Sequence, residues 1–167
     1  WISAFCEILG KKESGISGAK KSISFVVMLM LIIMAGLRDG VGRDFLSYQF
    51  HYELIHSDVI AISNESLEVG YSILNYISPS FRFVILFMAI FSIYLRYRSF
   101  EPLSCRNMIF LPLLFYYASD FLFYDMGVIR QGIAMSLCFF SIRYIIKRDA
   151  KFFVYILIAS LFHCSAI

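Results

Sequence analysis

The chain has 167 residues, of which 60% are hydrophobic and 16% are charged, and its formal net charge is +3. Soluble domains carry about 25% charged residues, so this composition exceeds what one water-soluble core can bury and indicates an integral membrane protein. It also excludes a nucleic-acid-binding protein, a disulfide-stapled secreted module and a disordered chain. At roughly 25–30 residues for each span and its connection, the length allows five or six transmembrane helices.

Six apolar runs are expected to form a bundle of transmembrane helices. Because both ends of the chain lie inside such runs, we interpret it as a piece of a longer polytopic protein, forming one membrane domain over residues 1–167 with a truncated first helix. Several charge-free cores are shorter than the about 20 residues that a span needs, so charged residues at their ends should lie at the headgroup level or face protein. The runs are residues 1–9, 22–37, 83–95, 107–124, 126–146 and 152–167.

The basic residues are distributed unevenly along the chain. Alternate connections hold eleven of the 15 Lys and Arg residues, while the opposite side of the membrane holds four and most of the acids. By the positive-inside rule the basic connections are cytoplasmic. Segment 38–80 and the tight turn near Asp125 are therefore predicted to face outward. The eleven basic residues are Lys11, Lys12, Lys20, Lys21, Arg96, Arg98, Arg106, Arg143, Lys147, Arg148 and Lys151.

Segment 38–80 is the longest polar stretch of the sequence. It is entered through residues 36–44, a glycine-punctuated turn with alternating charges. Residues 54–62 alternate only weakly between apolar and polar and are expected to be loop. Over 68–78 apolar residues recur at helical spacing, which predicts a short interfacial helix before Pro79. Long loops in compact architectures are usually functional or disordered, and the aromatic content of this one favours order.

Three predicted spans bring cationic or titratable groups to one membrane level. Counted at 1.5 Å per residue from the cytoplasmic ends of their helices, Arg38, Arg130 and His163 lie about 25, 24 and 18 Å into the membrane. Arg43 and Asp44 lie in the turn directly above them. Several arginines near one plane repel each other unless an anion lies between them, and the guanidinium fork suits phosphate oxygens. This pattern predicts an outward-facing anion site.

The same residues also have a purely structural interpretation. Arg38 and Arg130 can extend to the surface and pair with carboxylates. A single histidine such as His163 near a helix end is usually a packing residue, and the small residues after Arg130 suit close helix packing. The sequence leaves the anion site and the set of surface ion pairs open. The candidate acidic partners are Asp39, Asp44, Asp120 and Asp125.

Other motifs predict neither a metal nor a cofactor. His51 and His56 flank Glu53 without the i, i+4 spacing of a zinc-binding helix. The sequence contains no phosphate-cradling glycine loop followed by Lys and no Gly-x-Ser-x-Gly elbow. The four cysteines show no disulfide or metal spacing and are expected to pack as small apolar residues. They are Cys6, Cys105, Cys138 and Cys164.

Four stretches agree in order and spacing with one protein family. They are Gly36-Leu37-Arg38 followed by Val41-Gly42-Arg43-Asp44 and Tyr48; Glu68-Val69-Gly70-Tyr71; Ile129-Arg130-Gln131-Gly132-Ile133-Ala134; and Ala159-Ser160-Leu161-Phe162-His163-Cys164-Ser165-Ala166. With them the chain resembles roughly the first half of a member of the EpsG family of membrane polysaccharide polymerases, which is related to Wzy-type O-antigen polymerases. Val69 departs from the Pro common there, and Arg43 replaces a usually small polar residue.

The resemblance implies a glycosyltransferase at the outer face of a bacterial inner membrane. It would polymerise polyprenyl-diphosphate-linked oligosaccharides into O-antigen, exopolysaccharide or capsule, passing the growing glycan from its lipid diphosphate to the next lipid-linked unit. Cations at the outer leaflet would stabilise the leaving diphosphate, and a carboxylate or imidazole would accept the proton of the acceptor hydroxyl. Besides these glycans and the bilayer, chain-length regulator and flippase proteins are the expected partners.

Each expected site residue has a role in that chemistry. Arg38 and Arg130 would hold diphosphate oxygens with help from Arg43, and Asp44 would position Arg38 or act as base. His163 would contact the acceptor or the diphosphate. The sugar site would be lined by Tyr48, Glu68 and Tyr71, with Gln131 as a neutral donor and acceptor.

Two other functions fit the same pattern. A flippase for lipid-linked oligosaccharides also needs an outward cationic cleft, but it should carry charges at mid-membrane, and the expected spans have charge-free cores. A membrane O-acetyltransferase of the polysaccharide would need a histidine site open to a cytoplasmic acyl donor, whereas His163 is expected to lie outward.

Overall fold

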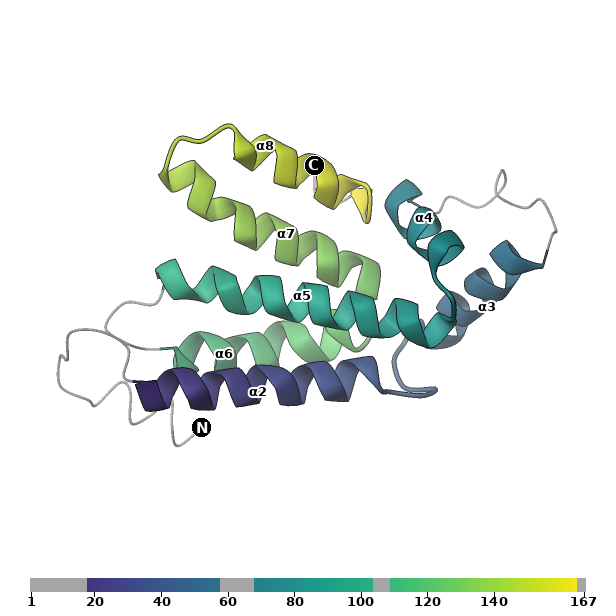
Figure 1. The fold of residues 1–167 in the computed structure, drawn as a ribbon, viewed down its shortest axis with the longest axis horizontal. Helices are drawn as coiled ribbons and strands as arrows, with labels where there is room; N and C mark the ends of the chain where they lie inside the picture. Colours follow the sequence, from purple (N-terminus) through teal and green to yellow (C-terminus); the bar gives the residue numbers. More distant parts are fainter. Residues whose placement is uncertain (1–17, 58–67, 104–108, 165–167) are drawn as a thin grey trace.

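A computed structural model describes residues 18–57, 68–103 and 109–164, and these residues form helices joined by turns (Figure 1). The expected span over 1–9 lies outside the described residues. One element, η2, is a π-helix, and it continues directly from α6. The elements are α2 (Gly18–Gly36), α3 (Phe45–His56), α4 (Val69–Ile77), α5 (Phe81–Leu103), α6 (Phe110–Tyr116), η2 (Tyr117–Asp125), α7 (Ile129–Ile146) and α8 (Lys151–Ser160).

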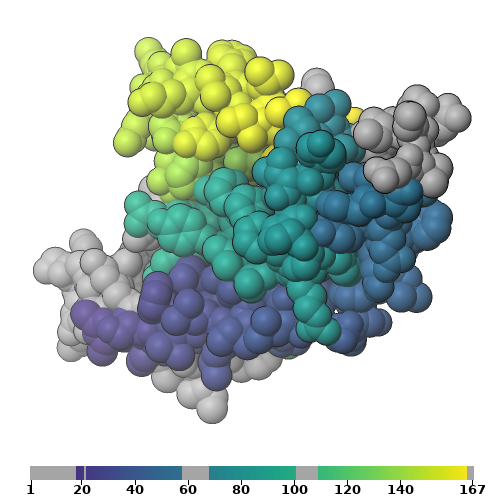
Figure 2. All heavy atoms as spheres, turned by 45° about the vertical axis from the view of Figure 1, so that its right-hand side comes forward, coloured from purple at the N-terminus to yellow at the C-terminus, as the bar shows by residue number. Residues whose placement is uncertain are grey.

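The long helices pack side by side around α5. Helix α5 contacts α2 on one side and α7 on the other, and α8 packs against α7 (Figure 1). The short helices α3 and α4 gather at one end of this bundle, which we call the α3–α4 end, and the turn between α7 and α8 lies at the opposite end. In the space-filling view, α4 lies next to the end of α8 (Figure 2). The end of the bundle therefore joins segments far apart in sequence.

Three of the described helices are long and apolar enough to cross a membrane: Gly18–Gly36, Phe81–Phe100 and Ile129–Ile146. Apolar side chains stay exposed on them, among them Met30 at 64% and Ile33 at 57% on α2. Such surfaces are unfavourable in water but match lipid. The prediction of a helical membrane protein is thus confirmed, with three spans of full length among the described residues. The expected spans over 107–124 and 152–167 are represented by α6 with η2 and by the ten-residue α8.

Two apolar cores lie on opposite sides of α5. One joins α5 to α7, α8 and the short helices α3 and α4, with Tyr48 and Tyr71 at its end. The other joins α5 to α2, α6 and η2. The first core matters for function, because it anchors α3 and α4 onto the ends of the long helices and so fixes the polar residues that those short helices carry.

The prediction that Arg96 and Arg98 lie in a cytoplasmic connection was wrong. Both belong to α5, which continues to Leu103, and the Arg96 side chain is only 1% exposed. Its Nη1 donates to Asp120 Oδ2 at 2.8 Å, and its guanidinium carbon lies 4.4 Å from the centre of the Phe139 ring. The helix continues because an arginine that meets a carboxylate and an aromatic ring inside the bundle need not leave the membrane. A charged pair therefore lies inside the bundle near the end of the candidate span Phe81–Phe100, whereas residues 83–95 are charge-free.

The predicted tight turn is present at residues 126–127, before α7, and Asp125 beside it is buried at 4% exposure. Its carboxylate accepts hydrogen bonds from the Ser92 hydroxyl and, at 2.7 Å, from the Tyr116 hydroxyl. Ser92 is in turn 2.9 Å from Ser136 on α7. The wider turns of η2, with bonds spanning five residues, carry the chain from Tyr116 to Asp125 within the bundle. These hydrogen bonds form one buried polar cluster that connects α5, α6, η2 and α7.

The polar segment between α2 and α5 contains more helix than expected. The interfacial helix predicted over 68–78 is confirmed as α4, but α3 was missed. Its buried residues Phe45 and Tyr48 are three positions apart, a spacing that indicates one helical face, although the weak alternation after Leu54 suggested a loop. The predicted helix over 152–167 ends early, since α8 stops at Ser160 and His163 lies in the turn that follows.

Candidate functional site

One carboxylate joins an arginine and a histidine at the α3–α4 end. Arg130, in the first turn of α7, donates from Nη1 to Glu68 Oε2 at 2.5 Å. The other oxygen, Oε1, lies 3.5 Å from Nδ1 of His163, which follows α8. The side chains of Arg130, Glu68 and His163 are 25%, 17% and 25% exposed. They are therefore sheltered but reachable, and they come from three separate elements.

A close backbone contact sets the distance between Glu68 and His163. The Gly70 N–H donates to the Leu161 carbonyl at 2.8 Å, which ties the start of α4 to the turn after α8. A Cβ at position 70 would lie only 2.8 Å from that carbonyl oxygen, so a side chain there would push the two segments apart. The glycine thus allows the contact that places the carboxylate beside the imidazole.

Two tyrosines pack behind the Arg130 guanidinium. The guanidinium carbon lies 5.5 Å from the ring centre of Tyr48 and 5.6 Å from that of Tyr71, and the two rings meet edge to face. Burial raises the pKa of both phenols, and Arg130 partly offsets the rise. Tyr48 and Tyr71 are 1% and 0% exposed, so both rings are buried and pack against Arg130 from the interior of the protein. The predicted role of these tyrosines in lining a sugar site stays a prediction.

Arg38 interacts electrostatically with Tyr48, and two of its three side-chain nitrogens have no hydrogen-bond partner among the described residues. Its side chain is buried, and Nη1 donates to the backbone carbonyl of Asp125 at 2.6 Å. Its Nε and Nη2 are buried and have no hydrogen-bond partner among the described residues. Desolvation lowers the pKa of Arg38, and nearby Asp125 and Tyr48 oppose that shift. Because Tyr48 interacts electrostatically with both Arg38 and Arg130, the two arginines face one neighbourhood.

Glycine also permits the approach of the turn that follows Arg38. Gly42 has a φ of +119°, which residues with a side chain rarely adopt. A Cβ there would collide with the Met126 carbonyl and would lie 3.7 Å from the Arg38 guanidinium carbon. The glycine therefore lets the turn after α2 pack onto the start of the α7 region, directly over Arg38.

The remaining predicted residues lie at the margin of this cluster. The Arg43 side chain is 75% exposed and makes a loose 4.0 Å ion pair with Asp44. Asp44 immediately precedes α3 and interacts with Tyr48 through its charge, whereas Gln131 is partly buried in the first turn of α7. The structure therefore brings together Arg130, Glu68, His163, Tyr48 and Tyr71, with Arg38 adjacent.

The ion pairs expected at the surface formed with other partners. Of the four candidate aspartates, Asp39 pairs with Arg82 at 2.8 Å and Asp120 pairs with the buried Arg96. The partner of Arg130 is Glu68, which the sequence placed in the sugar site. Arg38 meets the backbone of Asp125 and not its carboxylate. The two central arginines are thus held at the α3–α4 end and do not extend to exposed aspartates.

Cys164 was missed as a member of this region, and Asp125, a predicted partner of Arg38, contacts this arginine in a way that was not predicted. Cys164 is exposed, against the expectation of apolar packing, and its Sγ lies 3.7 Å from His163 Nδ1. Because Cys164 directly follows His163 in the sequence, the sequence alone could have indicated that it belongs to this region. Asp125 supports Arg38 through its carbonyl, and no local sequence pattern indicates a backbone contact of that kind. Cys6 and Cys105 lie outside the described residues.

Residues 21–167 of the chain match the family model of the EpsG family. The match covers far more than half of the 167 residues and confirms the resemblance that the four sequence stretches carry. The searches of curated proteins and of solved structures returned no match.

Proposed function

The chain belongs to the EpsG family, and on that premise we propose that it polymerises polyprenyl-diphosphate-linked glycan units at the outer face of a bacterial inner membrane. Membership indicates a polymerase-like role in polysaccharide biosynthesis. The observation that carries the proposal is the grouping of Arg130, Glu68 and His163 at one end of the bundle. It offers a cation for a phosphate and a proton acceptor for a hydroxyl within a few ångströms.

The distribution of charge supports an outward orientation of the α3–α4 end. The turn between α7 and α8, at the opposite end (Figure 1), carries Lys147, Arg148 and Lys151. Lys20 lies in the first turn of α2, whose other end reaches the α3–α4 end. By the positive-inside rule a basic end faces the cytoplasm. A lipid-linked glycan at the α3–α4 end would then be in the outer leaflet.

Arg130 and Arg38 are the proposed ligands of the diphosphate. Arg130 Nε and two nitrogens of Arg38 are buried without a hydrogen-bond partner among the described residues, and unmet charged donors are costly in a protein interior. Phosphate oxygens would satisfy them with charge-assisted bonds. The same contacts would strengthen as negative charge builds on the departing oxygen, which is the condition for catalysis.

His163 and Glu68 are the proposed proton-accepting pair. The acceptor hydroxyl oxygen would attack the anomeric carbon of the donor glycan, while the bond from that carbon to the phosphate oxygen breaks and its electrons stay on the diphosphate. The hydroxyl proton would pass to the His163 imidazole, and Glu68 Oε1, 3.5 Å from Nδ1, would stabilise the resulting imidazolium. Asp44, at the start of α3, remains the alternative base.

A transporter of the same lipids is the second candidate, because one observation favours it. Arg96 and Asp120 form an ion pair within the bundle, and buried charges in a membrane segment often mark a translocation path. However, the Arg96 guanidinium is also covered by the rings of Phe139 and Tyr116. That enclosure suits a structural pair better than a path, and polymerisation stays the better-supported function. The O-acetyltransferase alternative gains no support from a His163 at the proposed outer end.

Reconstitution of the full-length protein with defined lipid-linked repeat units separates the candidates. Units supplied in the outer leaflet should be converted to longer glycans on one lipid carrier, with release of free polyprenyl diphosphate in equal number to the bonds formed. A matched vesicle sample with units confined to the inner leaflet measures movement between leaflets. Elongation without movement supports the polymerase, whereas movement without elongation would overturn it in favour of a flippase.

A further inference from the structure

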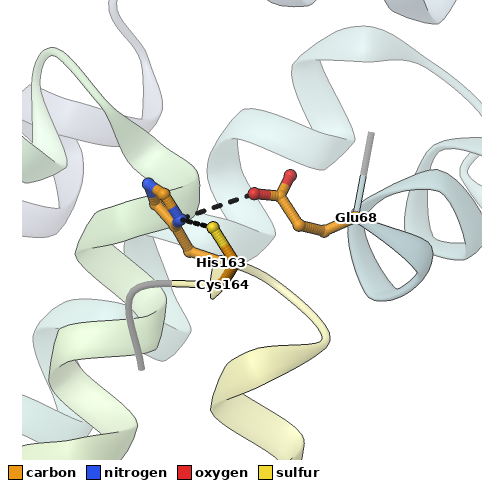
Figure 3. Close-up of side chains that lie close together, drawn as sticks. All are labelled: Glu68, His163 and Cys164. Carbon is orange, nitrogen blue, oxygen red and sulfur yellow. Dashed lines mark hydrogen bonds and ion pairs between the residues drawn. The ribbon is translucent and has the colours of Figure 1, made fainter. Parts of the chain in front are cut away.

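Three potential metal ligands of different chemistry meet beside the proposed active site. Glu68, His163 and Cys164 each point one ligand atom toward the others, and all three atoms lie within 4.8 Å of one another (Figure 3). They combine a carboxylate oxygen, an imidazole nitrogen and a thiol sulfur. Among common ions, zinc accepts all three donor types in one site.

The separations of the ligand atoms suit a tetrahedral ion. Bonds of about 2.0–2.3 Å at tetrahedral angles place ligand atoms about 3.4–3.6 Å apart. His163 Nδ1 lies 3.5 Å from Glu68 Oε1 and 3.7 Å from Cys164 Sγ. All three ligand atoms lie within 4.8 Å of one another, and the Cys164 side chain, which is exposed, would adjust toward the ion on binding. The fourth position would be open to water or to a substrate oxygen.

The neighbouring groups also suit a cation. Glu68 uses Oε2 for Arg130 and presents Oε1 toward His163, so the carboxylate can bind an ion without losing its arginine. An outer-shell partner of this kind orients a metal-binding carboxylate. Two anionic ligands, the carboxylate and the thiolate, would offset the charge of the ion beside Arg130. The Gly70–Leu161 backbone bond holds the two segments in place, so part of the site is formed before binding.

We propose that Glu68, His163 and Cys164 form a site for a zinc-type divalent cation. On binding, the Cys164 thiol releases its proton to solvent, and Nδ1 of His163 and Oε1 of Glu68 become ligands. The proposal differs from the sequence-based expectation of no metal, which considered spacing along the chain and not the meeting of α4 with the turn after α8.

The site has a consequence that rests on the proposed function. Zinc on Nδ1 of His163 and Oε1 of Glu68 would separate the carboxylate from the imidazole and lower the basicity of the other ring nitrogen, which polymerisation needs as proton acceptor. Zinc should therefore inhibit elongation reversibly, and a chelator should restore it. Because the ion can be detected without any glycan substrate, failure of the metal site and failure of the proposed polymerase activity are distinguishable.

Cobalt is the probe of choice for the test, since Co²⁺ takes the place of zinc and reports a bound thiolate through an intense near-ultraviolet charge-transfer band. The full-length protein, purified without a histidine tag, is titrated with Co²⁺ in detergent and then with Zn²⁺. The expected result is a thiolate band that saturates at one equivalent and is abolished by Zn²⁺. The absence of the band in folded wild-type protein would overturn the proposal.

Matched cysteine variants assign the band to its residue. Cys164→Ser should abolish it and weaken Zn²⁺ binding by more than the roughly 10- to 100-fold that the loss of an outer-shell partner costs. Cys138→Ser, at the other described free cysteine, should leave the band unchanged. A variant with serine at positions 6, 105 and 138 keeps Cys164 as the one cysteine of residues 1–167 and should retain the full band. A band that follows any cysteine other than Cys164 would refute the assignment.

Discussion

Two of the arginine–carboxylate pairs among the described residues have sharply different surroundings. Arg96 and Asp120 meet inside the bundle, where the arginine is 1% exposed and its guanidinium faces the rings of Phe139 and Tyr116. Arg130 and Glu68 meet at the α3–α4 end, where the arginine is 25% exposed. The first pair is enclosed by protein, whereas the second has a side open to a ligand.

The pairs also differ in what their carboxylates do. Asp120 is exposed only in part, at 21%, and its Oδ2 holds the buried arginine. Glu68 divides its two oxygens between Arg130 and His163, and Cys164 lies next to the histidine. An enclosed pair can only hold helices together, while a shared carboxylate can exchange protons and bind ions. Variants of each pair should therefore fail in different ways.

The largest effect is expected from breaking the enclosed pair. Arg96→Ala leaves Asp120 without its partner in the bundle, which should cost about 3–5 kcal/mol of stability. The measurement is the thermal unfolding of detergent-purified protein. The double variant Arg96→Met with Asp120→Leu removes both charges and should recover most of the loss. If Arg96→Ala were as stable as wild type but inactive, the pair would belong to a transport or catalytic path, and the contrast drawn here would be wrong.

Breaking the open pair should affect activity more than stability. Arg130→Ala removes the proposed diphosphate contact, which should cost about 2–3 kcal/mol of transition-state stabilisation, or a loss of elongation rate of roughly 30- to 150-fold. The measurement is the glycan chain-length distribution at equal protein level. Arg82→Ala is the matched control, because Arg82 pairs with Asp39 in a fully exposed ion pair worth at most about 1 kcal/mol. Normal long chains from Arg130→Ala would remove this residue from the site.

The sequence was sufficient for the elements with strong periodicity. The apolar runs that became α2, α5 and α7 stand out because a span must be continuously apolar, and α4 was predicted from helical spacing alone. The motifs around Arg130 and His163 indicated the family before the structure placed both residues beside Glu68. These features depend on local sequence, and so local reasoning finds them.

What the sequence could not give depends on contacts between distant segments. Arg96 resembles a residue at the end of a span until Asp120 and Phe139 are seen beside it. The grouping of Cys164 with His163 and Glu68 follows from the meeting of α4 and the turn after α8, and a rule based on spacing misses it. Helix α3 was missed because its packing face, Phe45 and Tyr48, is defined by partners on other helices.

A third variant, Gly70→Ala, separates the start of α4 from the turn after α8 and leaves the charges of the open site unchanged. In Gly70→Ala the added Cβ would lie 2.8 Å from the Leu161 carbonyl, so α4 must move by a few tenths of an ångström or more. Overpacking of this kind costs about 1–3 kcal/mol, and Glu68 should move away from His163, lowering elongation. Gly18→Ala is the control, since a Cβ at Gly18 meets nothing within 4 Å. Equal activity of both variants would show that the backbone contact does not position the site.

The smallest expected effect concerns Tyr71, whose ring packs against Arg130. It is measured as the free energy of unfolding at alkaline pH. Burial raises the pKa of Tyr71 above its ordinary value of about 10, so the folded protein keeps this phenol neutral while the unfolded chain ionises it. Its contribution to stability is complete below about pH 10 and declines above that value by about 1.4 kcal/mol per pH unit.

Tyr71→Phe, which removes a hydroxyl without a hydrogen-bond partner among the described residues, should lessen that decline and change little at neutral pH. Tyr76→Phe, at an exposed position of the same helix, is the control. If both variants lost stability as steeply as wild type above pH 10, Tyr71 would be open to water when folded, and Arg130 would lack the rigid aromatic support that distinguishes it from a surface arginine.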